Sequence, residues 1–96
     1  MDKTLDIRLS VDKIKQWGRT VGISGANGSG TPSRQYRKLL EEVGELGEAL
    51  IVNDKDETID AIGDCAVVLI LLAELKGLKF EDCLIVTGKP TVRPHC

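Results

Sequence analysis

The segment DAIGDCAVVLILLAE, residues 60–74, decides the fold because it changes from acidic to wholly apolar within about one helical turn. The run of nine apolar residues from Cys65 to Ala73 is roughly half as long as a membrane span. Asp64 precedes this run and Glu74 follows it. The segment therefore predicts a buried helix, covered on every side, and not a membrane anchor.

The residues before Thr31 predict one short helix and one loop. In LSVDKIKQWGRTVG, residues 9–22, apolar residues recur at helical spacing, with Ser10 as the expected N-cap. Gly18 and Gly22 are expected to loosen the end of this helix. The glycine- and serine-rich stretch that follows predicts a flexible loop, which could become ordered when a substrate binds.

Two long helices are expected next. Thr31 is the predicted N-cap of a helix that runs to about Val52, and Pro32 occupies its first position, where a missing N–H costs nothing. After the turn NDKDE, a third helix is expected over about residues 55–76, and Gly77 ends it.

A short fourth helix is predicted in KFEDCLIVTG, residues 79–88. The end of the chain, residues 87–96, contains two prolines and no periodicity, so we expect a loose tail. No alternating strand pattern is present. The chain is therefore predicted to be one all-α domain, residues 1–96, folded as a four-helix bundle. A helix that is apolar on every side needs more cover than three short companions give, which predicts a homodimer or a tetramer made of two dimers.

Composition excludes several classes of protein. The chain is 42% hydrophobic and 29% charged with a net charge of −2, which is typical of a globular protein and gives no basic block for a nucleic-acid polymer. The N-terminal residues lack the apolar core of a signal peptide, and no segment is long enough to cross a membrane. The three cysteines have no CxxC spacing, which predicts free thiols in the cytoplasm.

The second predicted helix contains KLLEEVGELGEAL, residues 38–50, in which one side is apolar and the other is acidic. The apolar side comprises Leu39, Leu40, Val43, Leu46 and Leu50. The acidic side comprises Glu41, Glu42, Glu45 and Glu48. An acidic side opposite an apolar side is usually solvated, so this helix alone predicts a wet surface.

The third predicted helix favours a different interpretation. Glu57, Asp60 and Asp64 share a face that becomes apolar core one turn later, so Asp64 is expected at the edge of the core. A carboxylate there is costly unless a cation neutralises it. Lys38 is the best internal candidate, but one lysine cannot neutralise the whole acidic group.

A divalent metal can neutralise such a group. Glu42 with Glu45, and Asp60 with Asp64, each place two carboxylates about one helical turn apart. If the two helices are antiparallel, these pairs can face each other and hold one or two Mg²⁺ ions, which prefer oxygen ligands. Such a site suits metal-assisted attack of water on a phosphorus atom.

This pattern resembles the MazG-like all-α nucleoside triphosphate pyrophosphohydrolases, whose signature is EExxE followed by ExxD. The residues that match are EEVGE at 41–45 and ETID at 57–60, with DAIGD bringing Asp64 in front of the apolar helix. The preceding segment IKQWGRTVGI…GTPSRQYRKLLEEVGEL also resembles the compact, phage-type members. The resemblance covers roughly residues 11–86. It implies Mg²⁺-dependent cleavage of a (d)NTP between the α and β phosphates, with Mn²⁺ as a possible substitute.

The resemblance also implies roles for individual residues. Glu42, Glu45 and Asp64 match metal ligands, and Glu41 matches a residue that orients or activates the attacking water. Many members have an acid at the position of Ala61, and Asp60 can take its place because residues four apart share a helix face.

Three features leave alternatives open. Trp17 either stacks on a nucleobase or belongs to the core. Lys38 either contacts a phosphate or pairs with Glu42 one turn away. The tail VTGKPTVRPHC, residues 86–96, differs from the basic segment that usually ends the phage-type members, which favours the alternative of a catalytically inactive helical interaction module.

Overall fold

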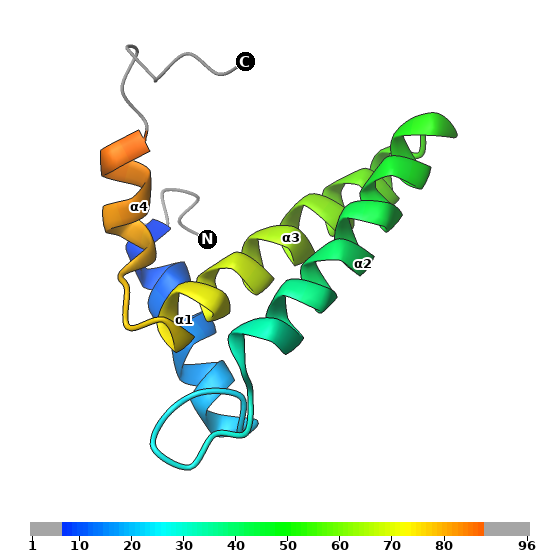
Figure 1. Cartoon of the computed structure of the whole chain (residues 1–96). Coiled ribbons are helices and arrows are strands. Elements are labelled where there is room, and N and C mark those ends of the chain that lie inside the picture. Colours follow the sequence, from blue (N-terminus) through cyan, green and yellow to red (C-terminus); the bar gives the residue numbers. More distant parts are fainter. Residues whose placement is uncertain (1–6, 88–96) are drawn as a thin grey trace.

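The computed structural model describes residues 7–87 and contains four helices in that range (Figure 1). They are α1 (Ile7–Thr20), α2 (Pro32–Ile51), α3 (Lys55–Leu75) and α4 (Phe80–Thr87). Residues 7–87 contain no strand, so the predicted all-α fold class is confirmed. Apart from Thr87, which ends α4, the predicted loose tail lies outside the described residues. The assignment of the whole chain to one domain stays a prediction.

Most of the predicted helix boundaries agree with the structure to within about two residues. The hydroxyl group of Thr31 accepts a hydrogen bond of 3.1 Å from the N–H of Arg34, which is the geometry of an N-cap. The prediction for Ser10 was wrong, because α1 already begins at Ile7 and Ser10 lies inside it. The apolar periodicity that marked this helix extends further toward the N-terminus than the capping signal indicated.

The turn between α2 and α3 makes these helices an antiparallel hairpin. Asn53 has a φ of 58°, and the N–H of Asp54 donates to the carbonyl oxygen of Ala49 at 3.0 Å, so the last turn of α2 is closed by a left-handed residue. The Asp54 carboxylate then accepts from the N–H of Glu57 at 3.1 Å and caps α3. One short turn thus ends one helix and begins the next.

Helix α3 is the centre of the fold, since α2, α1 and α4 all pack against it. Figure 1 shows the α2–α3 hairpin extending away from α1 and α4, so the molecule is V-shaped. The most buried apolar side chains come mainly from α3 and include Val68, Ile70 and Leu71. The side chain of Glu74 joins α1 to α3, because its carboxylate lies 2.5 Å from the Arg19 guanidinium and 4.0 Å from the Lys15 ammonium.

Gly18 allows the close contact between α1 and α3. It is buried inside α1, and a Cβ at this position would overlap the side chain of Leu71 and approach the hydroxyl of Ser24. The prediction that Gly18 loosens the end of the helix was therefore wrong. Its lack of a side chain instead leaves room for the side chain of Leu71, on α3, against the backbone of α1.

The loop between α1 and α2 is held by its own backbone. The N–H of Ser29 donates to the carbonyl oxygen of Gly22 at 2.8 Å, and the N–H of Gly30 donates to that of Ile23 at 2.9 Å. Gly22 and Gly25 have φ values of 85° and 88°, which glycine adopts without strain. The stretch expected to be a flexible loop is thus a folded loop that closes over the end of α1.

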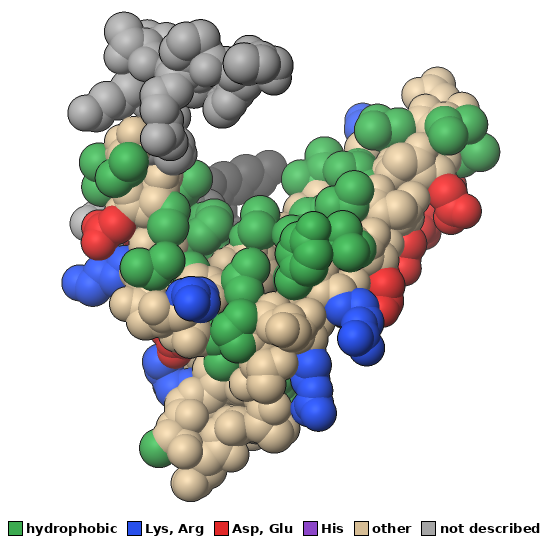
Figure 2. All heavy atoms as spheres, in the orientation of Figure 1, with side chains coloured by type: hydrophobic (Ala, Val, Ile, Leu, Met, Phe, Trp, Pro, Cys, Tyr) green, Lys and Arg blue, Asp and Glu red, His purple; other side chains and the backbone are tan. Residues whose placement is uncertain are grey.

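The apolar side of α2 faces the core only in part, since Leu39 and Leu46 are half-buried and the other three members are exposed. Leu40, Val43 and Leu50 are 53%, 49% and 60% exposed, whereas Glu42 on the acidic side is 5% exposed. Figure 2 shows hydrophobic side chains spread over the face of the molecule turned to the viewer, with acidic ones along the outer edge of α2. The solvated surface that α2 alone indicated therefore holds for Glu41, Glu45 and Glu48, which are exposed, but not for Glu42, which is buried.

The apolar segment of α3 is also not covered on every side. Leu69 is 39% exposed, and Ile62, one turn before the apolar run, is 56% exposed. None of the four described helices combines the length and the apolar character that crossing a membrane requires.

Candidate functional site

Three carboxylates from the α2–α3 hairpin meet in one cluster. Glu42 and Glu45 belong to α2 and Asp64 belongs to α3, and one carboxylate oxygen from each lies within 4.8 Å of the others. Residues three apart share one side of α2, and the antiparallel turn brings Asp64 opposite them. We call these three residues the acidic triad.

Each helix of the hairpin has a small residue on its buried side. Ala49 on α2 and Ala61 on α3 are each only 4% exposed, and neither fills much space between the helices. Ala61 stands where the resemblance led us to look for an acid, and the structure places it in the core. Its small side chain therefore contributes to helix packing, and the ligands must come from neighbouring positions.

Glu42 occupies the buried side of the triad. Its Oε2 atom lies 3.2 Å from the Lys38 ammonium, whereas its Oε1 atom is buried and has no hydrogen-bond partner in the described part of the chain. Leaving a buried carboxylate oxygen unpaired is costly. Glu45 and Asp64 are exposed, so a cation held by Glu42 would keep an open side toward solvent. The donor set of three carboxylates therefore fits a Mg²⁺ ion that retains several waters.

Lys38 neutralises part of the negative charge of the triad. Its ammonium is 3.2 Å from Glu42 and 3.8 Å from Glu41, which agrees with the predicted pairing one turn apart. The hydrogen bond and the charge of Glu42 raise the pKa of Lys38 above its ordinary value. Lys38 is half exposed, so it remains accessible from the solvent side of the hairpin.

Repulsion within the triad changes the titration of Glu45. The pKa of Glu45 is raised above its ordinary value, chiefly by the negative charge of Glu42, with desolvation and a carboxyl hydrogen bond to Glu42 as smaller causes. The charge of Lys38 acts in the opposite direction. Like charges that raise a carboxyl pKa mark a place where a cation is favoured.

The remaining predicted acids lie around the triad but not in it. Glu41 is exposed beside Lys38, and Asp60 is exposed one turn before Asp64. Glu48 and Glu57 line a separate hollow of about 510 Å³ near the tip of the hairpin, together with Glu45. The roles given to Glu41 and Asp60 stay predictions.

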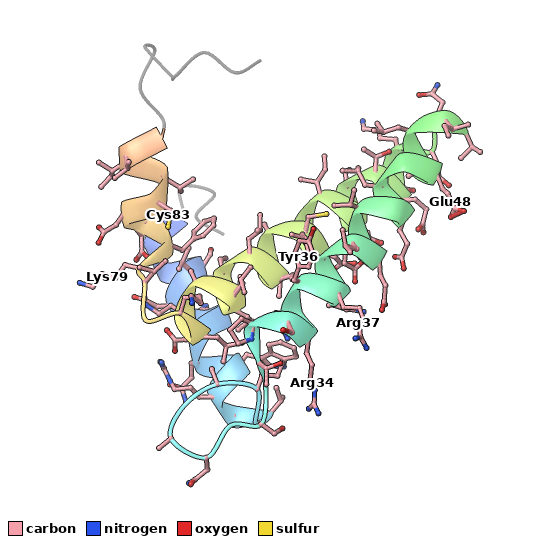
Figure 3. The ribbon with its side chains drawn as sticks, viewed as in Figure 1. Arg34, Tyr36, Arg37, Glu48, Lys79 and Cys83 are labelled. Carbon is pink, nitrogen blue, oxygen red and sulfur yellow. The ribbon has the colours of Figure 1, made fainter. Side chains whose placement is uncertain are left out.

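Two arginines that the sequence analysis did not single out precede the acidic stretch of α2. Figure 3 shows Arg34 and Arg37 projecting from the outer side of α2, on the side where Glu48 projects near the other end of the helix. Arg34 also donates to the carbonyl oxygen of Ser29 at 3.4 Å, which joins α2 to the folded loop. Arg34 and Arg37 are three residues apart and so share one side of the helix, and this spacing was the signal that could have found them.

A cavity of about 460 Å³ lies beside the triad, where α1, the loop and the hairpin meet. Glu42 and Asp64 line one part of it, and Trp17 lines another. Trp17 is 50% exposed, so the alternative that assigned it to the core was wrong. Lys38 borders the same cavity. The fold thus brings both predicted substrate-binding residues to one opening, next to the acids.

Comparison with known proteins agrees with this arrangement. The family model described as phosphoribosyl-ATP pyrophosphohydrolase matches residues 25–86, which contain all three acids of the triad. An uncharacterized 18.2 kDa protein from the rep-hol intergenic region of Haemophilus phage HP1 (strain HP1c1) is 36% identical over 69 residues. These residues are 72% of this chain and 40% of that phage protein, so the chain spans less than half the length of this relative. No solved structure matched the chain.

Proposed function

Because this chain belongs to the phosphoribosyl-ATP pyrophosphohydrolase family, we propose that it is a Mg²⁺-dependent nucleoside triphosphate pyrophosphohydrolase of the MazG-like type. It converts a (d)NTP to a (d)NMP and pyrophosphate, in the cytoplasm. The observation that carries the proposal is the acidic triad, in which three carboxylate oxygens lie within 4.8 Å of one another and one buried oxygen of Glu42 has no partner in the described residues.

In this proposal the triad holds the metal. Glu42, Glu45 and Asp64 supply the ligand oxygens, and Asp60 supplies a further one from the turn before Asp64. When bound, Mg²⁺ neutralises the phosphate oxygens and lowers the pKa of a coordinated water, and Mn²⁺ can substitute for it. The buried side of Glu42 excludes bulk water from one side of the site, while the exposed sides of Glu45 and Asp64 leave room for the phosphates.

Two further residues are proposed to act on the water and the phosphates. Glu41 orients the attacking water and accepts its proton, which requires a carboxylate within hydrogen-bond reach. Lys38 contacts a phosphate oxygen, and its ammonium already lies between Glu41 and Glu42. If Glu42 held a divalent cation, it would no longer need the charge of Lys38, and the Lys38 ammonium would be available to a phosphate oxygen.

The active form is proposed to be a homodimer or a dimer of dimers. Tyr36, Leu40, Val43 and Leu50 are exposed, and with Gly47 they follow the alternating spacing of four and three residues that forms a helix–helix seam. Ile59, Ile62 and Leu69 make a second exposed row on α3. Two parallel apolar rows on one hairpin fit the same face of a second copy, which would complete a bundle of four long helices.

The exposed apolar face also supports the second candidate function. A chain that only assembles would keep this face, and its triad would bind no substrate. The sequence of the tail favours this alternative of an inactive helical interaction module. Assembly alone therefore does not decide between the two functions.

Pyrophosphate release decides between them. The purified protein would be incubated with each of the common (d)NTPs and with phosphoribosyl-ATP, the compound after which the family is named. Each incubation would be done with Mg²⁺ and with a chelator. We expect Mg²⁺-dependent release of pyrophosphate, but not of single phosphate, and Asp64→Asn should abolish it. A protein that assembles normally but releases no pyrophosphate from any of these compounds would support the interaction module.

A further inference from the structure

The cavity beside the acidic triad has the lining of a small-molecule site. Its volume of about 460 Å³ lies in the usual range for ligand pockets. Ile23, Val67 and Leu71 provide apolar walls, and the half-exposed indole of Trp17 provides an aromatic surface. Apolar walls with one aromatic face suit a flat heterocycle, because such a ring can stack on the indole.

Gln35 is a polar group in this cavity that the proposed chemistry does not use. Its side chain is half-buried, and its amide group makes no hydrogen bond within the described part of the chain. An amide offers both an acceptor oxygen and N–H donors, and it can turn over to exchange them. Gln35 therefore can present either a donor or an acceptor to a ligand.

The order of residues on α2 places this amide where the base of a bound nucleotide would lie. Gln35, Lys38 and Glu42 are spaced by three and four residues and all line the cavity, so they share one side of the helix. At 1.5 Å per residue, Gln35 and Glu42 are about 10 Å apart along the helix. With the phosphates near Lys38 and the triad, the base of the same nucleotide would extend toward Gln35 and Trp17.

We propose that Gln35 binds the edge of the nucleobase and that its freedom to turn over makes the site accept both amino-bearing and keto-bearing bases. This inference rests on the proposed function, since it names the part of the substrate that the cavity receives. The stacking surface of Trp17 is available to any base, whereas the hydrogen bonds of Gln35 adapt to the base that is present. The site is thus expected to be broad in its base preference.

The inference can be tested without metal, phosphate or turnover, because Trp17 is the single tryptophan of the chain and its fluorescence reports on stacking. The wild-type protein would be titrated with deoxycytidine and with deoxyuridine, beside free tryptophan amide as a correction for absorbance. We expect both nucleosides to quench the fluorescence with dissociation constants within about threefold of each other, well below the tenfold change that corresponds to 1.4 kcal/mol.

Variants at position 35 identify the hydrogen bond. Gln35→Leu should weaken the binding of both nucleosides by roughly two- to tenfold, the usual effect of losing one neutral hydrogen bond. Gln35→Glu has nearly the same shape but offers only acceptors. It should retain the affinity for deoxycytidine and weaken the binding of deoxyuridine. Gln16→Leu is the matched control, because Gln16 is exposed on α1 and does not line the cavity.

The outcomes separate this inference from the proposed function. If no nucleoside quenches the fluorescence of Trp17 while the protein releases pyrophosphate, the proposed activity holds but the cavity is not the base site. If nucleosides bind but Gln35→Leu and Gln35→Glu change nothing, Gln35 does not bind the base. Quenching that responds to Gln35, in a protein that hydrolyses none of the tested substrates, would keep the base site and overturn the proposed reaction.

Discussion

The Lys38 ammonium lies 3.2 Å from one oxygen of the Glu42 carboxylate, while the other oxygen of the same group is buried without a hydrogen-bond partner in the described residues. One positive charge thus compensates half of a carboxylate that the fold has removed from water. The same carboxylate belongs to the acidic triad, in which Glu45 already has a raised pKa. A second cation is the simplest way to satisfy the unpaired oxygen.

Lys38→Met should destabilise the metal-free protein by about 1–2 kcal/mol, because the buried Glu42 carboxylate would lose its cation. The loss is smaller than for a fully buried pair, since Lys38 is half exposed and solvent screens its charge. Urea denaturation would measure it, with Lys13→Met on the exposed side of α1 as the control. Mg²⁺ should remove much of the difference. Equal losses in the two variants would exclude a special role for Lys38.

Mg²⁺ should stabilise the folded protein if the triad binds it. At ten times the dissociation constant, binding adds about 1.4 kcal/mol to the free energy of unfolding, which raises the thermal midpoint of a domain of this size by roughly 5–10 °C. Asp64→Asn should abolish the increase, whereas Asp12→Asn on α1 should retain it. If neither Mg²⁺ alone nor Mg²⁺ with nucleotide changes the thermal midpoint of the wild type, the proposed metal site is contradicted.

Glu45 should titrate above its ordinary value in the metal-free protein, because the charge of Glu42 raises its pKa. At pH values above this pKa both groups are charged and their repulsion costs stability, and at lower pH the protonated Glu45 relieves it. Glu45→Gln should therefore be slightly more stable than the wild type at neutral pH, and the gain should vanish on acidification.

Titration of the side-chain carboxyl NMR resonance of Glu45 would test this directly. In Glu42→Gln the pKa of Glu45 should fall back toward its ordinary value, because the main cause of its increase is removed. Asp12→Asn, exposed on α1, is the control that should leave it unchanged. A Glu45 that titrates normally in the wild type would show that Glu42 does not act on it.

The four glutamates of α2 should differ in their effect on hydrolysis. Glu42→Gln and Glu45→Gln should remove nearly all turnover, since both are proposed metal ligands. Glu41→Gln should lower turnover by about 10²- to 10⁴-fold, as expected for a lost general base, yet leave the binding of Mg²⁺ with nucleotide mostly intact. Glu48→Gln, one turn beyond Glu45, should be the mildest. Turnover and nucleotide affinity would be measured in parallel, and a Glu48→Gln as damaging as Glu45→Gln would refute these roles.

The exposed apolar rows of the hairpin should hold two chains together. Light scattering is expected to return at least twice the 10.4 kDa mass of one chain at micromolar concentration. Leu40→Lys or Val43→Lys, each in the middle of the row, should shift the protein toward the monomer by burying a charge in the interface. Val21→Lys, equally exposed but on the loop, is the control. A wild-type monomer would show that this face serves another purpose.

The sequence by itself determined the local features, because each depends on interactions within about one helical turn. Thr31 and Asp54 cap their helices through hydrogen bonds to backbone groups three residues away. Gly77, with a φ of 71°, ends α3 where a glycine was expected to end it. The spacing of the acids predicted that Glu42 with Glu45 would face Asp60 with Asp64. The set of Glu42, Glu45 and Asp64, which the structure brings together, was implied by the family resemblance.

Only the tertiary structure decided which side of each helix is covered. Periodicity divides α2 into an acidic and an apolar side, but it does not state which side meets α3. The packing of α2 against α3 buries Glu42 to 5% exposure and leaves Leu40 53% exposed. The same long-range packing brings Trp17 and Gln35, from separate helices, to the cavity beside the triad. Such contacts depend on the shapes of surfaces far apart in the chain, which no local pattern encodes.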